Sequence, residues 1–450
     1  MVAIVPLLAC LDPVLTPTLS RQFTRIALAL LTMTGRVTMR GLSRWTGEGG
    51  SYRTIQRFFA TVIPWASVFW LFFRRHCFAP GDVYVLAGDE VVVTKAGKHT
   101  YGLARFFSSL YGKPIPGVAF FALALLSTRE RHSFPIRVEQ VVRDPADQAA
   151  GRRRRRRKTP PPAAAPRRRG RPQGTKNTDK TAVTLTPELQ QIKGMVQGLR
   201  QMIGGVVPLT YLVLDGHFGT NTAVQMVRQC DLHLISKLRA DSALYLPYDG
   251  PYAGRGPHRK YGDKLNYAAL PERHLQQTTV EDDVETRIYH IEVLHKEFAQ
   301  ALNVVIMVKT NLKTKTCAHV VLFSSDLTLA WQQLVDYYCL RFQIEFNFRD
   351  AKQLWGLEDF MNTRPIAVTN AANLSLFMVN LAYRCLQDLR HSDPACSMLD
   401  LKAHYRGVKY VEETLKMLPE MPEPILLAQI FAKIASLGRI HAVPPDSIAS

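Results

Sequence analysis

The chain has 450 residues, of which 47% are hydrophobic and 9% aromatic, so it is long enough for two or three domains with their own cores and is not a disordered polypeptide. Lysine and arginine outnumber aspartate and glutamate by 57 to 37, which gives a formal net charge of +20. A balance that basic indicates a polyanionic partner, either nucleic acid or an acidic membrane surface.

The cysteines and the apolar stretches narrow that choice. The seven cysteines are scattered and form no CxxC pair, which is typical of reduced thiols and argues against a zinc site. No apolar run reaches the roughly 18 residues needed to span a bilayer, and the apolar residues 1–10 lack the basic stretch of a signal peptide. We therefore expect nucleic acid rather than lipid as the partner, no membrane contact, and a cytoplasmic location.

Residues 1–78 are predicted to form a helical domain. Apolar residues recur at helical spacing over 20–31, and two shorter helices, 38–45 and 51–59, flank a glycine-rich turn. Such a pair resembles a helix-turn-helix, which would place Tyr52, Arg53 and Arg57 on the helix that faces a DNA groove. A plain packing bundle explains the same pattern equally well.

Residues 79–240 are predicted to form the first part of an α/β core. Strand patterns cover 82–93, 118–126 and 135–142. An apolar strand over 206–214 then leads directly into Asp215, and a helix over 220–230 joins it to a further strand over 232–238. Strand, helix and strand at this spacing indicate a parallel sheet.

A basic arm interrupts this core at residues 145–182. Residues 152–180 carry thirteen basic side chains and one acid, Asp179, so +12 of the +20 lies in 29 residues. Like charges at this density oppose compaction, and we expect a disordered arm that binds nucleic acid. Within it, Arg169-Gly-Arg171-Pro172 resembles the core of an AT-hook, which lies in a narrow minor groove. Nonspecific binding to phosphates is the alternative.

The second half of the chain is predicted to hold three further regions. Residues 241–326 are rich in turns and then in strands, which indicates a β-rich insertion. Residues 327–362 contain one long helix, expected over 328–355. Residues 363–450 form a helical C-terminal region, with helices over 367–388 and 424–435.

The long helix carries the most specific pattern in the sequence. Tyr338, Arg341, Glu345 and Lys352 lie at offsets of 0, 3, 7 and 14 residues. At about 100° per residue they project into one sector of roughly 60°. A carboxylate, two cations and a phenol on one face suit a site that holds a metal ion and phosphates together. For Arg341 and Glu345 alone, the alternative is an ion pair on a solvated helix face.

Two further carboxylates occupy positions that favour catalysis. Asp89 lies within an apolar strand, where an unpaired acid is costly unless it binds a partner or a metal. Asp215 follows a buried strand, at the edge where open α/β sheets bind their ligands. With Glu345 they can hold two divalent ions for in-line phosphoryl transfer. Glu90 is interpreted as structural, although a shift of one residue in the register would exchange it with Asp89. His217 could contact a phosphate or cap the next helix.

These residues resemble the bacterial insertion-sequence transposases with DDE chemistry that carry a Tyr-Arg-Glu-Lys (YREK) signature. Tyr338-x2-Arg341-x3-Glu345-x6-Lys352 fits that spacing without a gap. Asp89-Glu90, followed by Lys95 and Lys98, and Asp215-Gly-His-Phe-Gly look like the group's two aspartate regions. The resemblance runs from about residue 20 to about residue 385, and its motifs are specific only in combination. The basic arm is longer and richer in arginine than the group's pattern.

The resemblance implies a ribonuclease-H-like core with a β-rich insertion between the second aspartate and the glutamate. It also implies a transposase that cuts insertion-sequence ends and joins the freed 3′-hydroxyls to target DNA, using two Mg²⁺ ions, for which Mn²⁺ can substitute. Asp89, Asp215 and Glu345 would be the catalytic metal ligands. Double-stranded DNA, comprising terminal inverted repeats and target, would be the partner of a homodimer. Its contacts would come from the following residues: Tyr338, Arg341, Lys352, Lys95, Lys98, Arg53, Arg57, Arg169 and Arg171.

Two other functions remain open at this point. The first is a metal-dependent nuclease that cuts without joining. The second is a catalytically silent DNA-binding regulator derived from a transposase, against which the intact set of three acids argues.

Overall fold

The structure is a computed structural model, and it describes residues 4–47, 49–108, 112–143, 179–252, 254 and 258–441. Arg169 and Arg171 of the predicted AT-hook-like core, and most of the predicted basic arm, lie outside the described residues. The rest is a mixed α/β fold, so the predicted fold class is confirmed at that level.

A single large sheet runs through the described part of the chain. At its centre, β1 (Tyr84–Thr94) pairs antiparallel with β3 (Lys113–Ser127), and β3 pairs antiparallel with β4 (His132–Val141). On its other side, β1 pairs parallel with β5 (Tyr211–Val213), which pairs parallel with β6 (His233–Leu238). These strands therefore lie in the order β4-β3-β1-β5-β6. The short β2 (Ala104–Ser108) pairs with the beginning of β3.

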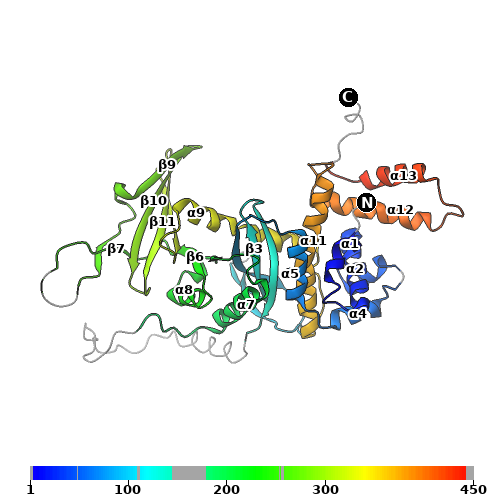
Figure 1. The fold of residues 1–450 in the computed structure, drawn as a ribbon, viewed down its shortest axis with the longest axis horizontal. Helices are drawn as coiled ribbons and strands as arrows, with labels where there is room; N and C mark the ends of the chain where they lie inside the picture. The colour runs from blue at the N-terminus through cyan, green and yellow to red at the C-terminus, as the bar shows by residue number, and fades with distance from the viewer. Residues whose placement is uncertain are drawn as a thin grey trace.

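The strands between residues 241 and 326 continue this sheet and do not form a separate one. The first link is β12, which pairs antiparallel with β6, and the order then runs β12-β11-β10-β7-β8, with β9 paired to β10. Figure 1 shows these strands extending away from the helices at the opposite end of the molecule. Their bounds are β7 Leu244–Pro247, β8 Tyr261–Lys264, β9 Leu275–Glu281, β10 Val284–His295, β11 Ala301–Asn311 and β12 Cys317–Ser324.

Helices pack on the central strands. The helix after β4, α7, begins where the Thr186 hydroxyl accepts a bond from the Leu189 N–H and Pro187 occupies the first turn. Helix α8 connects β5 to β6 and packs on β6, whereas α10 lies against β4 and β1. The bounds are α7 Pro187–Ile203, α8 Asn221–Arg228, α9 Trp331–Leu340 and α10 Gln343–Gln353, with short 3₁₀ turns at Gly216–Phe218 and Glu272–His274.

The single helix predicted over 328–355 is wrong, because α9 and α10 are separated at Arg341 and Phe342. The N–H groups of Phe342, Ile344 and Glu345 each donate to the carbonyl three residues earlier, so the chain tightens into a 3₁₀-like turn there. A projection at 100° per residue does not hold across this turn. Arg341 still meets Glu345 four residues later and lies near the Tyr338 ring, whereas its link to Asp89 is a tertiary contact.

The N-terminal and C-terminal helices share one core. Figure 1 shows them side by side at one end of the molecule, and the rings of Phe23 and Phe377 meet edge to face at 5.1 Å. The polar side chain of Asn370 joins the same core, since it accepts a bond from Trp65 Nε1 at 2.8 Å. The bounds are α1 Ile4–Leu8, a 3₁₀ turn at Ala9–Leu11, α2 Pro17–Thr32, α3 Met39–Trp45, α4 Tyr52–Ala60, α5 Trp65–His76, α11 Pro365–Arg390, α12 Met398–Leu415 and α13 Pro424–Ser436.

One helix, α11, is long and apolar enough to cross a membrane by length and composition, and the bent pair α4–α5 passes the same test jointly. The sequence search for an uninterrupted apolar run missed α11 because asparagine and serine punctuate it. In the structure 78% of its most apolar window is buried. Its Asn370 and Asn380 amides donate to the carbonyls of Phe59 and Pro135, which is the behaviour of a helix inside a protein core.

Candidate active site

Asp89 lies in the middle of β1, on the central strand of the sheet. The preceding residue is Gly88, where a Cβ would lie 2.7 Å from the ring of Phe121 and 2.9 Å from Leu214. The absence of a side chain therefore lets β1 pack closely at this point. The Asp89 side chain is only 20% exposed, and its carboxylate accepts a bond from the Glu90 N–H at 2.8 Å.

Asp215 stands immediately beyond β5, next to Asp89. The parallel register pairs Leu86 with Leu212 and Ala87 with Val213, so continuing it by two residues places Asp89 beside Asp215, on the same face of the sheet. The turn after β5 is fixed by hydrogen bonds: Asp215 Oδ1 accepts from the His217 N–H at 3.0 Å, and Ser236 Oγ donates to the Asp215 carbonyl at 2.6 Å. Two carboxylates, one from the middle of β1 and one from just beyond the end of β5, are thus neighbours.

The third carboxylate, Glu345, is brought in by Arg341. Arg341 Nη1 donates to Asp89 Oδ2 at 2.6 Å, and Nη2 donates to Glu345 Oε1 at 3.3 Å. Glu345 lies in the first turn of α10, where the helix dipole favours a negative charge. The guanidinium, 252 residues after Asp89 in the chain, therefore ties the first carboxylate of the predicted set to the last.

The charges in this cluster perturb the pKa of Asp89. Burial is the largest effect and raises the pKa of this carboxyl group, and the neighbouring Asp215 raises it further. Arg341 and the Glu90 N–H act in the opposite direction but do not compensate. The interactions with Arg341 and the Glu90 N–H therefore do not fully offset the burial of the Asp89 carboxylate, and pKa values perturbed in this way are common at functional sites.

Tyr338 and Lys352 lie beside this cluster without contacting its carboxylates. The Tyr338 ring centroid is 5.9 Å from the guanidinium carbon of Arg341, and burial raises the pKa of the Tyr338 phenol. Lys352 Nζ donates to the Val92 carbonyl at 3.0 Å and pairs with Glu358 at 3.3 Å. Glu358 could not be singled out from the sequence, because it lies in a turn with no recognisable motif.

The remaining predicted DNA contacts differ in how accessible they are. Lys95 Nζ donates to the Glu358 and Phe360 carbonyls and lies 3.5 Å from the Phe360 ring centroid. Burial lowers the pKa of Lys95 to about 8. Because its ammonium group donates to these two carbonyls, Lys95 connects the segment after β1 to residues 358–360 in the described structure. By contrast, Lys98, Arg53 and Arg57 are exposed.

Glu90 and His217 belong to a neighbouring group of charges. The main electrostatic partners of Glu90 are Arg143 and Glu188, and burial raises its pKa. His217 Nε2 lies 3.5 Å from Glu188 Oε2, so the side chain has an acidic partner while its N–H holds Asp215. In this geometry Asp89, rather than Glu90, is the acid that meets Arg341.

The donor set suits a hard divalent cation, because Asp89, Asp215 and Glu345 offer only carboxylate oxygens. Among the described residues, however, no three His, Cys, Asp or Glu side chains are grouped closely enough to hold a metal ion. Between Asp89 and Glu345 the cation present is Arg341 itself. The acids are therefore assembled as neighbours around an arginine rather than as a preformed metal cage.

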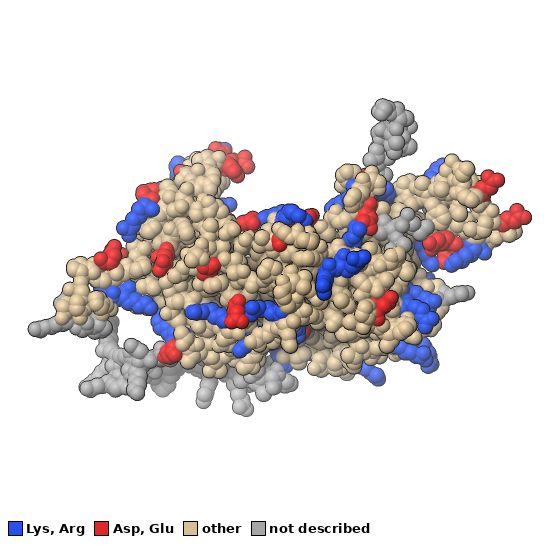
Figure 2. Space-filling model, in the orientation of Figure 1, with Lys and Arg blue, Asp and Glu red and all other residues tan. Residues whose placement is uncertain are grey.

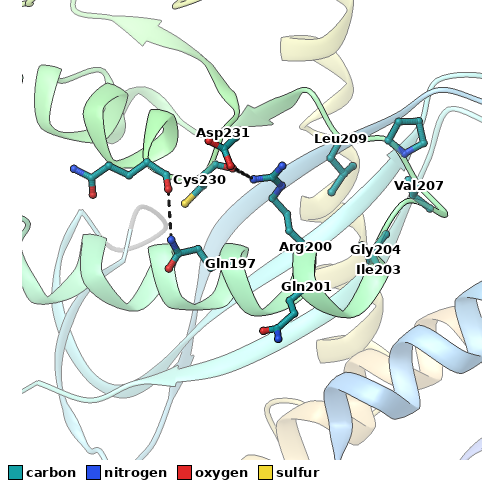
Figure 3. Close-up of a pocket in the computed structure, with 11 residues that line it drawn as sticks. Gln197, Arg200, Gln201, Ile203, Gly204, Val207, Leu209, Cys230 and Asp231 are labelled. Carbon is teal, nitrogen blue, oxygen red and sulfur yellow. Dashed lines mark hydrogen bonds and ion pairs between the residues drawn. The ribbon is translucent and has the colours of Figure 1, made fainter.

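A cavity of about 570 Å³ lies elsewhere, and Figure 3 shows the residues that line it. Its wall includes Leu209, just before β5, and Asp231, just before β6, so it is at the opposite end of these parallel strands from Asp215. Arg200 on its wall is paired with Asp231 at 3.0 Å. None of the three predicted carboxylates lines this cavity.

A scan against protein-family models matches residues 6–294 to the DDE superfamily endonucleases. The chain belongs to this family. The matched region contains both aspartates of the cluster and ends before α9 and α10, so Glu345 and Arg341 are placed by the structure alone. A comparison with curated proteins finds no match. Members of such a nuclease family act on DNA in general and use divalent metals such as Mg²⁺.

Proposed function

We propose that this protein is a DDE transposase of the YREK group that cuts insertion-sequence ends and joins the 3′-hydroxyls to target DNA. The observation that carries the proposal is the contact of Arg341 with both Asp89 and Glu345, beside Asp215 on the neighbouring strand. A nuclease of this family needs its acids gathered from distant parts of the chain. The cluster satisfies that need at the edge of a sheet where α/β folds place their ligands.

The sheet order supports a ribonuclease-H-like core as part of this proposal. Three antiparallel strands, β4-β3-β1, are followed by two strands parallel to β1, and the insertion strands begin only after β6. The proposed acids then come from the central strand, from the end of its parallel neighbour and from the helix that follows the insertion. This is the arrangement that the resemblance to the YREK transposases implies.

Each residue of the cluster has a proposed role. Asp89, Asp215 and Glu345 would hold two Mg²⁺ ions, with Mn²⁺ as a substitute; when bound, such ions activate the attacking oxygen and stabilise the leaving oxygen. Arg341 and Lys352 would bind phosphates of the cut strand. The Tyr338 phenol would position the backbone beside the cut. Burial raises the pKa of this phenol, so it stays protonated and would donate a hydrogen bond to the backbone that it positions.

The N-terminal helices support DNA as the partner. Residues 17–60 contain a single acid, Glu48, and the arginines among them are all exposed. Figure 2 shows basic side chains gathered over these helices at the lower right of the view. We propose that this face binds DNA nonspecifically or through a helix-turn-helix, in a homodimer at the nucleoid. The seven arginines are Arg21, Arg25, Arg36, Arg40, Arg44, Arg53 and Arg57.

The test is an incubation of the purified full chain with its flanking terminal DNA, Mg²⁺ and a target plasmid. A transposase gives cut ends and joined product, a nuclease gives cut ends only, and a DNA-binding regulator gives neither. Asp215→Asn keeps an oxygen for the His217 N–H but loses the charge, and we expect it to abolish cutting.

The matched control is Asp231→Asn. Asp231 follows α8, has a φ of 51°, which asparagine tolerates, and is 84% exposed. We expect this variant to cut normally. Cutting by Asp215→Asn at the rate of the wild type would refute the proposal.

A further inference from the structure

The way in which Arg341 is held is unusual for a residue that binds DNA phosphates. Its side chain is 12% exposed, and two of its three nitrogens donate to Asp89 and Glu345. Its third nitrogen, Nε, is buried and has no hydrogen-bond partner among the described residues. In this conformation the guanidinium faces the acids of the proposed site and leaves one donor unsatisfied.

The unsatisfied Nε gives this conformation an internal cost. A buried donor without a partner loses its hydration without compensation. The two charged hydrogen bonds to Asp89 and Glu345 offset that loss. The guanidinium therefore keeps this conformation as long as no acceptor group binds it more favourably than these two carboxylates do. A phosphate supplies several acceptor oxygens, and a guanidinium binds one through paired donors.

The same contacts bear on cation binding. Asp89 Oδ2 and Glu345 Oε1 are the oxygens that accept from Arg341, and they belong to two of the three proposed metal ligands. A second cation at these oxygens would meet the positive charge of the guanidinium at close range. Arg341 and a divalent ion therefore compete for Asp89 and Glu345.

We propose that Arg341 is a counter-ion that DNA releases: without DNA it occupies Asp89 and Glu345, and a phosphate of bound DNA draws it away and frees both carboxylates for divalent metal. This inference rests on the proposed function. DNA and metal then bind with positive coupling, and the coupling is reciprocal, so metal also tightens DNA binding. The protein would thereby hold little catalytic metal until its substrate is in place.

A purely structural ion pair would behave differently. If Arg341 only fastened α10 to β1, its removal would loosen the site and weaken metal binding. If it is the competing cation, its removal strengthens metal binding in the absence of DNA. The two readings thus predict opposite signs for one measured quantity.

The experiment is a titration of the full chain with Mn²⁺. Binding is measured by calorimetry and by the electron spin resonance signal of free Mn²⁺. It is run with and without a short terminal duplex that already carries the cut 3′ end. Without DNA, we expect Arg341→Gln to bind Mn²⁺ about 10-fold more tightly than the wild type, within the usual range of coupling between sites. With DNA, we expect the wild type to gain most of that factor and Arg341→Gln to gain little.

The matched control is Arg349→Gln. Arg349 lies on α10, eight residues after Arg341, carries the same charge and forms an ion pair with Asp350 at 3.0 Å, with its side chain 53% exposed. It should bind Mn²⁺ as the wild type does, which separates a local effect from a change in net charge. Arg341→Lys keeps the charge but cannot reach both carboxylates with paired donors, and we expect an intermediate affinity. It serves as the second variant if Arg341→Gln fails to fold.

Two failures can be told apart. Equal or weaker Mn²⁺ binding by folded Arg341→Gln, or no tightening of wild-type Mn²⁺ binding by DNA, overturns the counter-ion role even while the wild type cuts DNA. Failure of the wild type to cut DNA with Mg²⁺ or Mn²⁺ overturns the proposed function, whatever the titration gives.

Discussion

Asp89 and Asp400 are both acids taken out of water, but their surroundings differ. Asp400, in the first turn of α12, is completely buried. Its carboxylate accepts bonds from the Ser397 N–H and hydroxyl at 2.9 and 2.7 Å, from the Ile440 N–H, and from the N–H and ring of His441 at 3.3 and 2.9 Å. Among the described residues, Asp89 accepts hydrogen bonds only from Arg341 and the Glu90 N–H, and a second acid stands beside it.

The pKa values follow from that difference. Burial alone would raise the pKa of Asp400, but the hydrogen bonds from Ser397, His441 and Ile440 outweigh it and hold the pKa well below its ordinary range. For Asp89 burial prevails, and the pKa is raised. A carboxylate whose lone pairs accept hydrogen bonds from several protein donors has a structural role. A carboxylate with fewer donors around it can still bind a ligand.

The largest effect should come from Asp89→Asn. Asparagine keeps an oxygen for the Glu90 N–H but places an amide NH2 where the other carboxylate oxygen accepts from Arg341, and it removes the charge, so metal-dependent DNA cutting should fall by at least about 1,000-fold. The folded pKa of Asp89 is raised, which means that its ionisation above about pH 4 opposes folding. The variant should therefore be within about 1 kcal/mol of the wild-type free energy of unfolding at pH 7. A large loss of stability in urea melts would show that Asp89 is structural after all.

The opposite pattern is expected for Asp400→Asn. Breaking its network leaves buried donors unpaired, and the free energy of unfolding at pH 7 should fall by about 3 kcal/mol. Because the folded pKa is lowered, the stabilisation by Asp400 is complete above the unfolded value of about 3.9 and disappears as the pH falls below it. The difference between variant and wild type in urea melts should shrink on acidification. Cutting per folded molecule should be unchanged, and a specific loss of cutting would break the comparison.

Lys402, which lies on α12 with Asp400, extends the comparison from buried acids to a buried cation. Lys402 is 8% exposed, donates to the Leu30 carbonyl at 2.8 Å and has a pKa that burial lowers to about 8. Lys402→Met leaves that carbonyl unpaired and should cost about 2 kcal/mol in thermal or urea unfolding. Between pH 8 and about 10.4 the unfolded chain holds the extra proton, so wild-type stability contributed by this group rises with pH. The deficit of Lys402→Met should widen over that interval, and a deficit that narrows would contradict the assignment.

The smallest expected effect is on DNA affinity. Arg53→Ala with Arg57→Ala removes two exposed cations of α4 and touches neither buried acid. We expect affinity to fall by about 10-fold and the slope of log affinity against log salt to decrease by roughly 2. Unfolding and cutting at saturating DNA should not change. An unchanged salt slope would place the DNA-binding face elsewhere.

Much of the local structure could be predicted from the sequence. The sequence pattern located α2, α8, β1, β4 and β6 to within a few residues, because burial fixes those patterns. The strand expected over 206–214 is shorter, since only Tyr211–Val213 pair. The break at Arg341 and Phe342 could not be foreseen, because both residues keep right-handed helical dihedral angles. Only the hydrogen bonds change there.

The candidate site was less accessible to sequence reasoning. The spacing of Arg341 and Glu345 indicates that they can meet, but nothing local indicates that Arg341 reaches Asp89 on β1. The burial of Lys95 against Phe360 was likewise invisible, because a lysine beside a turn has no distinguishing pattern. Such contacts depend on which elements the sheet brings together. The family match supports the nuclease class.

The most direct test of the proposed metal site is Asp215→Cys. Mg²⁺ requires oxygen ligands, whereas Mn²⁺ also accepts sulfur, so exchanging the carboxylate for a thiolate should change which metal supports cutting. The wild type should cut terminal DNA with either ion. Asp215→Cys should be inactive with Mg²⁺ and regain cutting with Mn²⁺. Cutting by Asp215→Cys with Mg²⁺ at the wild-type rate would contradict the account, because Asp215 would then hold no metal.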